Sequence, residues 1–205
     1  MPTTRLLLLR HAEVEENFQH LFGGRVDMNL SPRGHEQAAA LAAHLKSVPL
    51  AAIYASPMKR VQQTLAPLLA NGTPRLVVLP GLREMDFGDW TGRRWSDIAA
   101  HQQVSNSQWL ELLARGAVAN AESEPALRER VEPCWRQMVR DHPGETVAVA
   151  CHGGVIRMLL AIALDLPLGR FGSFEVEYAS VTVVEARSDR NILKSLNYTP
   201  WQNGK

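Results

Sequence analysis

Short apolar runs alternate along the chain with segments of helical spacing. Strand-like runs lie at 6–9, 51–55, 76–79 and 146–150; they are too brief for stable helices and apolar enough to be buried on both faces. Helices are expected between them, from Ser31-Pro32 to Lys46, from Ser56-Pro57 to about Ala70, from about Glu122 to Asp141, and from Val155 onward. This alternation predicts an α/β fold with a largely parallel sheet covered by helices on both faces.

Other segments follow the same pattern less regularly. Three further strand-like runs, at 174–178, 181–186 and 192–196, close the chain, and 95–119 looks helical without a clear period. Each of the two serine-proline pairs provides an N-cap and a first-turn proline. Pro133 predicts a kink or a break in its helix. Because no repeat or linker interrupts the pattern, residues 1–205 are interpreted as one domain, a three-layer sandwich.

Composition and charge narrow the class of protein. The chain has 205 residues and a net charge of +1, so no global field attracts nucleic acid or an anionic membrane, and anion affinity must come from locally placed arginines. Its apolar runs are too short for a secretory signal or a membrane helix. The two cysteines are too few for a framework of disulfide bonds, and no Cys-x-x-Cys pair suggests a zinc site. We expect a soluble, cytoplasmic protein without nucleic-acid or membrane partners.

Residues suited to phosphate chemistry follow the predicted strands. Arg10-His11 follows the first strand, Arg60 lies at the start of the helix after the second, and His152 with Gly153-Gly154 follows 146–150. Ligands of open α/β sheets bind beyond the carboxyl ends of the strands, so we expect these side chains to lie together. The run after 76–79 adds Glu84 and Asp86.

These residue types supply what phosphoryl transfer needs. Arginine donates to two oxygens at once and stays charged. A histidine nucleophile needs a neutral ring whose other nitrogen is held by a hydrogen bond. A carboxyl group can protonate the leaving oxygen, a part that either Glu84 or Asp86 could play at this stage.

Four ordered motifs carry a family resemblance. They are LLRHAE at 8–13, SPMKRVQQT at 56–64, LREMDFGDWTG at 82–92 and ACHGGVIR at 150–157. Together they resemble the histidine phosphatase superfamily, which includes the cofactor-dependent phosphoglycerate mutases. The resemblance implies a phosphoglycerate mutase-like fold, catalysis without a metal or another cofactor, and a phosphohistidine formed on His11.

The resemblance also implies roles for the other residues. Arg10, Arg60 and His152 would form the phosphate pocket, and Glu84 would protonate the leaving group, with Asp86 as its competitor. Asn17 lies six residues after His11, where relatives place an asparagine that also touches phosphate.

One position departs from the family pattern. The motif usually reads Arg-His-Gly, and here the third residue is Ala12. If the glycine only lets the backbone approach phosphate, a methyl group is a small intrusion. If that position needs a positive φ angle, alanine adds strain. We favour the first interpretation.

The sequence favours a phosphomonoesterase that acts on a small phosphorylated metabolite. A cap-like insertion at about 90–120 contains, beyond Arg93-Arg94, only Arg115 as a further lysine or arginine, which disfavours a bisphosphorylated substrate and hence a phosphoglycerate mutase. The 82–92 segment also resembles alpha-ribazole phosphatases and other short broad-specificity members. Alpha-ribazole phosphate, a sugar phosphate and a nucleotide all remain open as substrates.

Several rivals and minor expectations remain. A non-catalytic phospholigand-binding protein is favoured only by Ala12, and a metal hydrolase is disfavoured by the lack of a ligand cluster. The C-terminal strands could supply a homodimer interface. The other histidines are interpreted as surface groups, at positions 20, 35, 44, 101 and 142, and Trp90, Trp95, Trp109 and Trp135 as core or pocket wall.

Overall fold

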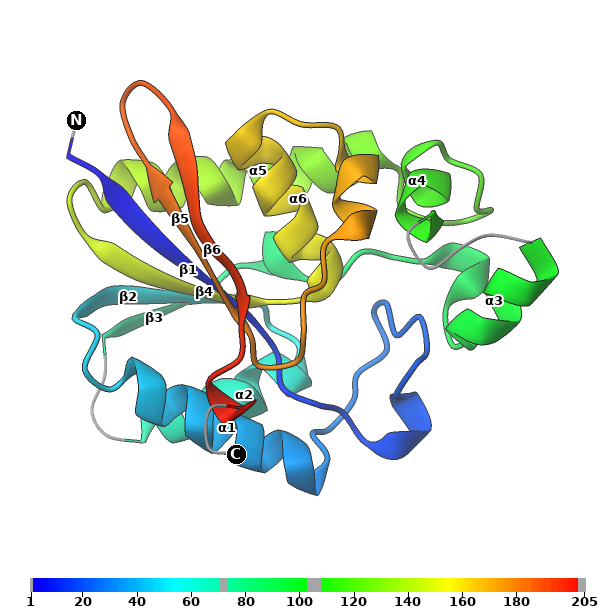
Figure 1. Cartoon of the computed structure of the whole chain (residues 1–205), viewed down its shortest axis with the longest axis horizontal. Helices are drawn as coiled ribbons and strands as arrows, with labels where there is room; N and C mark the ends of the chain where they lie inside the picture. Colours follow the sequence, from blue (N-terminus) through cyan, green and yellow to red (C-terminus); the bar gives the residue numbers. More distant parts are fainter. Residues whose placement is uncertain (1, 71–73, 103–107, 203–205) are drawn as a thin grey trace.

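The computed structural model describes residues 2–70, 74–102 and 108–202. Its centre is a six-stranded sheet in the order β3-β2-β4-β1-β5-β6 (Figure 1). The strands are β1 (Thr4–Arg10), β2 (Leu50–Ala55), β3 (Arg75–Val78), β4 (Thr146–Cys151), β5 (Val181–Ala186) and β6 (Asn191–Tyr198). The first four strands of this order run parallel, and β5 pairs antiparallel with both β1 and β6.

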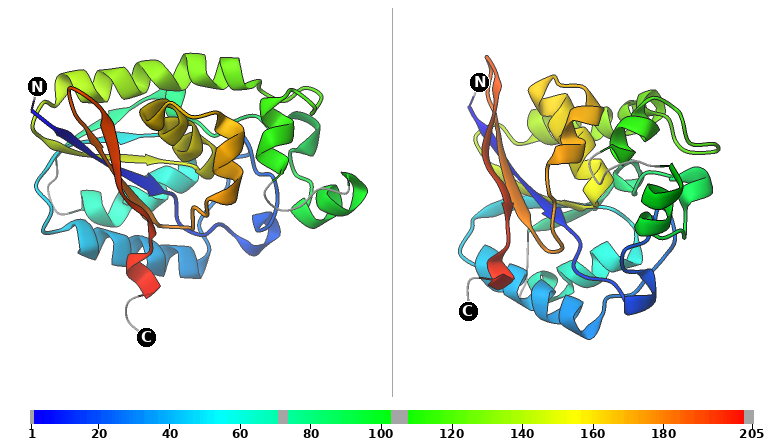
Figure 2. Two further views of the ribbon diagram at one scale, coloured as in Figure 1. Left: turned by 45° about the horizontal axis from the view of Figure 1, so that its top comes forward. Right: turned by 45° about the vertical axis from the view of Figure 1, so that its right-hand side comes forward.

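Helices cover both faces of the sheet (Figures 1 and 2). The helices are α1 (Pro32–Leu45), α2 (Lys59–Leu69), α3 (Trp95–Gln102), α4 (Trp109–Ala114), α5 (Glu124–Asp141) and α6 (Gly153–Leu164). The pair α1 and α2 lies on one face and the pair α5 and α6 on the other, while α3 and α4 lie beyond the end of the sheet where β1 and β4 end. The predicted α/β sandwich with a mostly parallel sheet is confirmed.

Within the described residues, five short 3-10 turns connect these elements. They are η1 (Glu16–Phe18), η2 (Pro80–Leu82), η3 (Gly88–Trp90), η4 (Leu168–Ser173) and η5 (Pro200–Gln202).

The four leucines of β1 contribute to the hydrophobic cores on both faces of the sheet. Leu6 and Leu8 belong to the core shared with α5 and α6, whereas Leu7 and Leu9 belong to the core shared with α1 and α2. All four are at most 4% exposed. Successive side chains of a strand point to opposite faces, so a continuous apolar run buries both faces of a central strand.

The helix starts were predicted with mixed success. Ser31 caps α1, because its hydroxyl accepts from Gly34 N at 2.9 Å, and Pro32 is the first helical residue. The cap predicted at Ser56 is wrong: α2 starts at Lys59, and the Ser56 hydroxyl instead lies 2.8 Å from the Nε2 of His152. Of the kink or break expected at Pro133, the break does not occur, since α5 is continuous through this residue.

The strand predicted at 174–178 is also wrong, because this segment is a loop between η4 and β5. Its carbonyls accept from arginine side chains instead of a neighbouring strand: Arg157 Nη2 donates to Phe174 O at 2.8 Å, and Arg10 Nη1 donates to Val176 O. Apolar alternation alone does not distinguish a strand from a loop whose backbone is bound by side chains.

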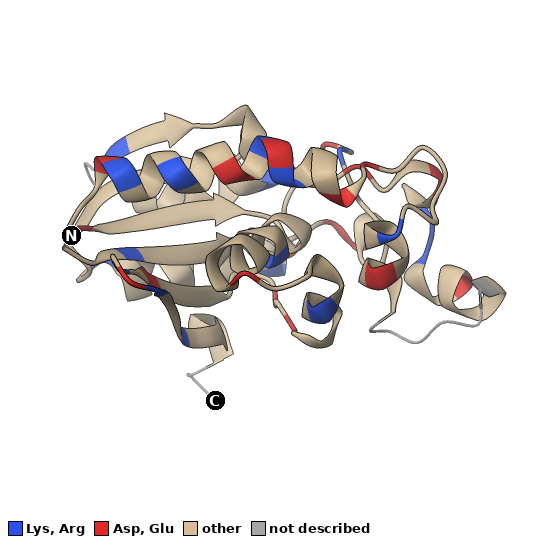
Figure 3. Cartoon of the chain, turned by 90° about the horizontal axis from the view of Figure 1, so that it is seen from above, with Lys and Arg blue, Asp and Glu red and all other residues tan. Residues whose placement is uncertain are grey.

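Charges of both signs are mixed on the surface, as the alternating blue and red segments of α5 show (Figure 3). Two ion pairs link successive turns of α5, Arg128–Glu124 and Arg136–Glu132. Within the described ranges, no helix is long and apolar enough to cross a bilayer.

Candidate active site

Two parallel strands place two histidines side by side. In the β1–β4 register Arg10 pairs with Cys151, so His11 and His152 follow the ends of neighbouring strands. The backbone N–H of His11 donates to Cys151 O at 3.0 Å. The two ring centroids are 5.2 Å apart. Parallel pairing thus brings into contact two histidines that lie 141 positions apart in the sequence.

His11 is held as a neutral ring. Its Nδ1 lies 2.8 Å from Ala12 O, and because a carbonyl can only accept, Nδ1 carries the proton. The pKa of His11 is well below its usual value because the ring is buried and because Arg60 and Arg10 lie nearby; the bond to Ala12 opposes this shift. The Nε2 of His11 therefore has a free lone pair at neutral pH, as a nucleophile requires.

His152 is fully buried behind His11. The Ser56 hydroxyl accepts from Met58 N at 3.3 Å and lies 2.8 Å from Nε2 of His152. In the tautomer of His152 whose Nδ1 carries the proton, that hydroxyl donates to Nε2. Burial, followed by Arg60 and His11, lowers its pKa well below the usual value. Within the described ranges of the chain, neither its Nδ1 nor the Nε of Arg10 has a hydrogen-bond partner, and both atoms are buried, so each is available to a bound anion.

Arg60 is fixed in the first turn of α2. Only 2% exposed, it donates from Nη1 to Val26 O at 2.8 Å and from Nη2 to Gly24 O at 3.0 Å. Burial lowers its pKa, but a guanidinium stays protonated in proteins. Arg60 therefore presents a rigid positive charge to the pocket. It also holds α2 against the loop that contains Gly24 and Val26.

Arg10 is held by a tyrosine that the sequence analysis missed. The guanidinium carbon lies 4.1 Å from the ring centroid of Tyr178, a cation–π contact. The same ring lies 5.5 Å from that of His11. The neighbouring Ala179 has a positive φ of 50° and donates from its N to His11 O at 3.2 Å. No sequence motif surrounds Tyr178. Its role becomes visible only in the structure, where the loop between η4 and β5 packs against the end of β1.

Glu84 lies against the start of α6. One carboxylate oxygen accepts from Gly154 N at 3.2 Å and the other from Met85 N at 2.9 Å. A Cβ on Gly154 would lie 2.6 Å from Glu84 Oε1, so this glycine permits the close approach. Arg130 of α5 holds the preceding loop through Gly81 O and Arg83 O, each at 2.7 Å.

Asp86, the alternative acid, lies elsewhere. Its carboxylate accepts from Gly88 N at 3.0 Å and lies 3.8 Å from Arg25 Nε. Glu84 lines the pocket and Asp86 does not. The structure therefore brings Glu84, and not Asp86, to the histidines.

Besides Asp86, two expected residues do not line the pocket, namely Asn17 and the fully buried His152, although the ring of His152 packs 5.2 Å from that of His11. Asn17 lies exposed on η1, whereas its neighbour Phe18 lines the pocket. The six-residue spacing from His11 thus places Asn17 on a segment that borders the pocket, but Asn17 itself does not line it.

Ala12 is accommodated without backbone strain. It is fully buried, its φ is not among the positive values, and its N–H donates to Thr64 Oγ1 at 2.9 Å. Its methyl group packs in the core beneath β1 with Leu9 and Ala38. The concern that alanine would need a left-handed conformation is thereby removed.

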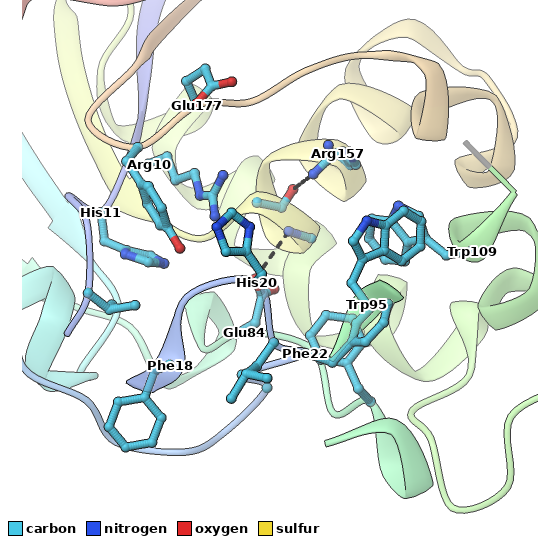
Figure 4. Close-up of a pocket in the computed structure, with 18 of the residues that line it drawn as sticks. Arg10, His11, Phe18, His20, Phe22, Glu84, Trp95, Trp109, Arg157 and Glu177 are labelled. Atoms are coloured by element: carbon cyan, nitrogen blue, oxygen red, sulfur yellow. Dashed lines mark hydrogen bonds between the residues drawn. The ribbon is translucent and has the colours of Figure 1, made fainter. Parts of the chain in front are cut away.

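The pocket has two unlike ends (Figure 4). Its volume is about 620 Å³. We call Arg10, His11, Arg60 and Glu84 the histidine end; all four line the pocket. Away from His11, Figure 4 shows Phe22, Trp95 and Trp109, and Phe87 lines the same part of the pocket, with its ring centroid 5.0 Å from that of Phe22. We call these four side chains the aromatic wall.

The remaining histidines and tryptophans largely lie where the sequence predicts. His20 is exposed, as expected of a surface group, and it also lines the pocket; it has a positive φ of 59° and its carbonyl accepts from Trp95 N at 3.0 Å. Trp95 and Trp109 are pocket wall, as the sequence allowed, while Trp90 and Trp135 are buried in the core. The exposed Arg93 and Arg94 lie outside the pocket.

The site can bind an anion beside a neutral nucleophile. Buried guanidinium groups stabilise charge that develops on phosphoryl oxygens, because they are fixed before the reaction begins. A carboxyl group lies in the same cavity, within reach of a leaving oxygen. Among the described side chains, no cluster of three or more histidine, cysteine, aspartate or glutamate residues could hold a metal ion.

Known proteins resemble the whole chain. It is 29% identical over 195 residues to phosphoserine phosphatase 1 of Hydrogenobacter thermophilus, covering 95% of this chain and 92% of that protein. It is 28% identical over 193 residues to the adenosylcobalamin/alpha-ribazole phosphatase of Escherichia coli, covering 94% of this chain and 95% of that protein. The structure of mycobacterial glucosyl-3-phosphoglycerate phosphatase has a TM-score of 0.83 and 26% identity, covering 96% of this chain and 99% of that one. Residues 6–199 match the histidine phosphatase superfamily (branch 1), and the chain belongs to this family.

Proposed function

We propose that the protein is a metal-independent phosphomonoesterase that carries phosphate transiently on His11. The observation that supports this most strongly is the state of His11: neutral, with Nδ1 bound to Ala12 O, and close to two arginines. Relatives of this chain named as phosphatases cover almost its entire length. Phosphoserine, alpha-ribazole phosphate and sugar phosphates are candidate substrates.

The reaction proceeds in two balanced steps. The Nε2 of His11 attacks phosphorus and forms a P–N bond, the ester P–O bond breaks, and Glu84 gives its proton to the leaving oxygen. Water then attacks phosphohistidine, its proton passes to Glu84, and the P–N bond breaks to release phosphate. Arg10 and Arg60 stabilise the equatorial oxygens in both steps, and His152 supports His11 and donates to the phosphate through Nδ1.

A mutase is disfavoured by the charges of the pocket. It must hold a second anionic group while it returns the phosphate. Among the described residues that line the cavity, the arginines are Arg10, Arg60 and Arg157, and no lysine contributes. Arg157 already donates to three backbone carbonyls, so a second phosphate has little to bind.

We also propose a cytoplasmic location, supported by two free, buried cysteines, Cys134 and Cys151. The homodimer expected through the C-terminal strands stays a prediction; β6 forms one edge of the sheet.

The experiment is hydrolysis of p-nitrophenyl phosphate in excess chelator by the wild type and by His11→Ala. We expect turnover by the wild type and a loss of about 10⁴-fold or more in the variant, because the nucleophile is removed. The matched control is His35→Ala, which changes an exposed histidine of α1 and should keep full activity. Equal activity in all three proteins would contradict the proposal, as would loss of wild-type activity in chelator.

A further inference from the structure

The side of the pocket opposite His11 is a continuous aromatic surface. The ring of Phe22 lies 5.0 Å from Phe87, 5.9 Å from Trp95 and 5.6 Å from Trp109, measured between centroids. Phe87 and Trp109 are 6.0 Å apart. These separations and the steep interplanar angles are those of edge-to-face packing. Phe22 and Phe87 are buried, while Trp95 and Trp109 are only partly buried and line the cavity.

The aromatic wall is fixed by backbone hydrogen bonds. Phe22 N donates to Arg93 O at 3.1 Å, Gly92 N to Phe22 O at 2.9 Å, and Trp95 N to His20 O at 3.0 Å. These bonds join the loop after η1 to the segment that leads into α3. A surface that is already ordered loses little conformational entropy when a ligand binds to it.

The cavity is much larger than phosphate and a short alcohol require. Its volume of about 620 Å³ lies within the range of roughly 300–1,000 Å³ that is typical of pockets for drug-sized ligands. Because the histidine end holds the phosphate, most of this volume is available to the alcohol part of the ester.

The arginine beside Trp109 is bound mostly within the protein. Arg157 donates from Nε to Phe171 O at 3.1 Å, from Nη1 to Gly153 O at 3.1 Å, and from Nη2 to Phe174 O at 2.8 Å. Its guanidinium carbon lies 5.5 Å from the Trp109 ring centroid. Arg157 thus holds the loop after η4 against α6, and most of its N–H groups are used within the protein rather than available to a second anionic group.

We propose that the alcohol part of the substrate carries a flat aromatic group that packs against Trp109 and Trp95. This inference rests on the proposed phosphatase activity, and it names the substrate class of the same pocket. An aromatic ring gains from burial of its apolar surface and from edge contacts with neighbouring rings. A small charged alcohol such as serine makes neither contact.

The first test compares 2-phenylethyl phosphate with ethyl phosphate. Both esters release primary alcohols of similar acidity, so the comparison isolates the ring from the chemistry of the leaving group. We expect kcat/KM to be about 100-fold higher for 2-phenylethyl phosphate, from burial of one phenyl ring. Equal values for the two esters, or a higher value for phosphoserine than for 2-phenylethyl phosphate, would overturn the proposal.

Variants of Trp109 test the location of the ring. In Trp109→Leu the ratio of the two kcat/KM values should fall by about 10-fold, and Trp109→Phe should retain most of it, because an aromatic face remains. The matched control is Trp135→Phe on α5, which lies in the core outside the pocket and should leave both values unchanged. An unchanged ratio in a folded Trp109→Leu protein would overturn the assignment.

A binding measurement separates this proposal from the proposed function. The non-hydrolysable analogues are 3-phenylpropylphosphonate and propylphosphonate, titrated calorimetrically into the wild type. Tighter binding of the phenyl compound by about 100-fold supports the aromatic subsite, even if no ester is turned over and the phosphatase proposal has failed. Equal affinities overturn the aromatic subsite, even if His11-dependent hydrolysis is observed.

Discussion

The two ends of the pocket differ in how the chain builds them. Most of the histidine end comes from a strand end and a first helical turn, where the register between β1 and β4 fixes His11 beside His152, and Glu84 joins it from the loop between η2 and η3. The aromatic wall comes from two loops, which carry Phe22 and Phe87, and from the starts of the short helices α3 and α4, joined by backbone bonds such as that from Phe22 N to Arg93 O. Regular structure thus fixes the nucleophile and Arg60, and loops and short helices at the end of the sheet shape the space for the rest of the ligand.

The two ends also differ in polarity. At the histidine end, buried donors are held by protein carbonyls, as Arg60 is by Val26 O and Gly24 O. The aromatic wall offers apolar contact area but few hydrogen-bond donors. Changes to the histidine and arginines of the histidine end should therefore affect every substrate equally, changes to Glu84 should depend on how much the leaving group needs a proton, and changes at the aromatic wall should affect only substrates with a bulky alcohol.

After His11→Ala, the largest effect is expected for Arg60→Lys. Lysine keeps the charge but cannot bind two loop carbonyls and a phosphate with one planar fork. We expect kcat/KM to fall by about 10²–10³-fold, as for removal of one donor to a transition-state oxygen. The loss should be the same for ethyl phosphate and 2-phenylethyl phosphate. A matched Arg93→Lys protein, altered at an exposed arginine outside the pocket, should be unaffected; a loss confined to one ester would contradict the division of the pocket.

Glu84→Gln should follow. We expect a loss of about 10²-fold on ethyl phosphate, whose alcohol needs a proton to leave, and a much smaller loss on p-nitrophenyl phosphate. Asp86→Asn provides the control, because Asp86 carries the same kind of group but lies outside the pocket. Equal losses on both esters in Glu84→Gln, or the larger loss in Asp86→Asn, would remove Glu84 as the acid.

Gly154→Ala should cost less. The new Cβ would lie 2.6 Å from Glu84 Oε1 and 3.1 Å from Met85 Sδ, so the carboxylate must move. We expect kcat/KM for ethyl phosphate to fall by about 10-fold through misplacement of the acid. In Gly153→Ala the atom nearest to the new Cβ is Arg157 Nη1, at 3.1 Å. The ratio of activity on p-nitrophenyl phosphate to activity on ethyl phosphate should therefore differ between Gly153→Ala and Gly154→Ala. Full activity of Gly154→Ala would show that this contact is dispensable.

The smallest effect is one of pH on stability. Burial lowers the pKa values of His11 and His152 in the folded protein. Below about pH 6.5 the unfolded chain binds protons that the folded protein does not bind. The free energy of unfolding therefore falls as pH drops below 6.5, by up to about 1.4 kcal/mol per pH unit for each histidine.

Urea unfolding of wild type and His11→Gln between pH 5 and 8 measures this effect. The variant should lose one histidine's share of the slope below pH 6.5 and none above it. His35→Gln, altered at an exposed position, should keep the wild-type slope. Parallel curves for wild type and His11→Gln would mean that His11 is not held neutral.

Prediction from sequence succeeded where a feature is local. The four apolar strands, the Ser31 cap and the clustering of Arg10, His11, Arg60 and Glu84 all follow from short motifs combined with parallel pairing. It failed where a distant group decides the local structure. Ser56 bonds His152 rather than capping a helix, and 174–178 gives its carbonyls to Arg10 and Arg157 rather than to a strand.

The aromatic wall shows the same limit. Trp95 and Trp109 were expected as core or pocket wall, but Phe22, His20 and Tyr178 carried no signal. Their positions depend on where two loops return to the sheet, through contacts such as Tyr178 with Arg10 at 4.1 Å. The prediction for Asn17 is wrong for the opposite reason: its spacing from His11 is the expected one, but the residue lies exposed on η1.

The most direct test of the account is to trap the covalent intermediate. Wild-type protein is mixed with ³²P-labelled 2-phenylethyl phosphate, quenched in alkali within milliseconds, and the labelled peptide is identified by mass spectrometry. We predict label on His11 that is stable in alkali and lost in acid, as a phosphoramidate should be, and that is absent from His11→Ala. Label on another residue, or turnover by the wild type with no trapped label and full activity in His11→Ala, would contradict it.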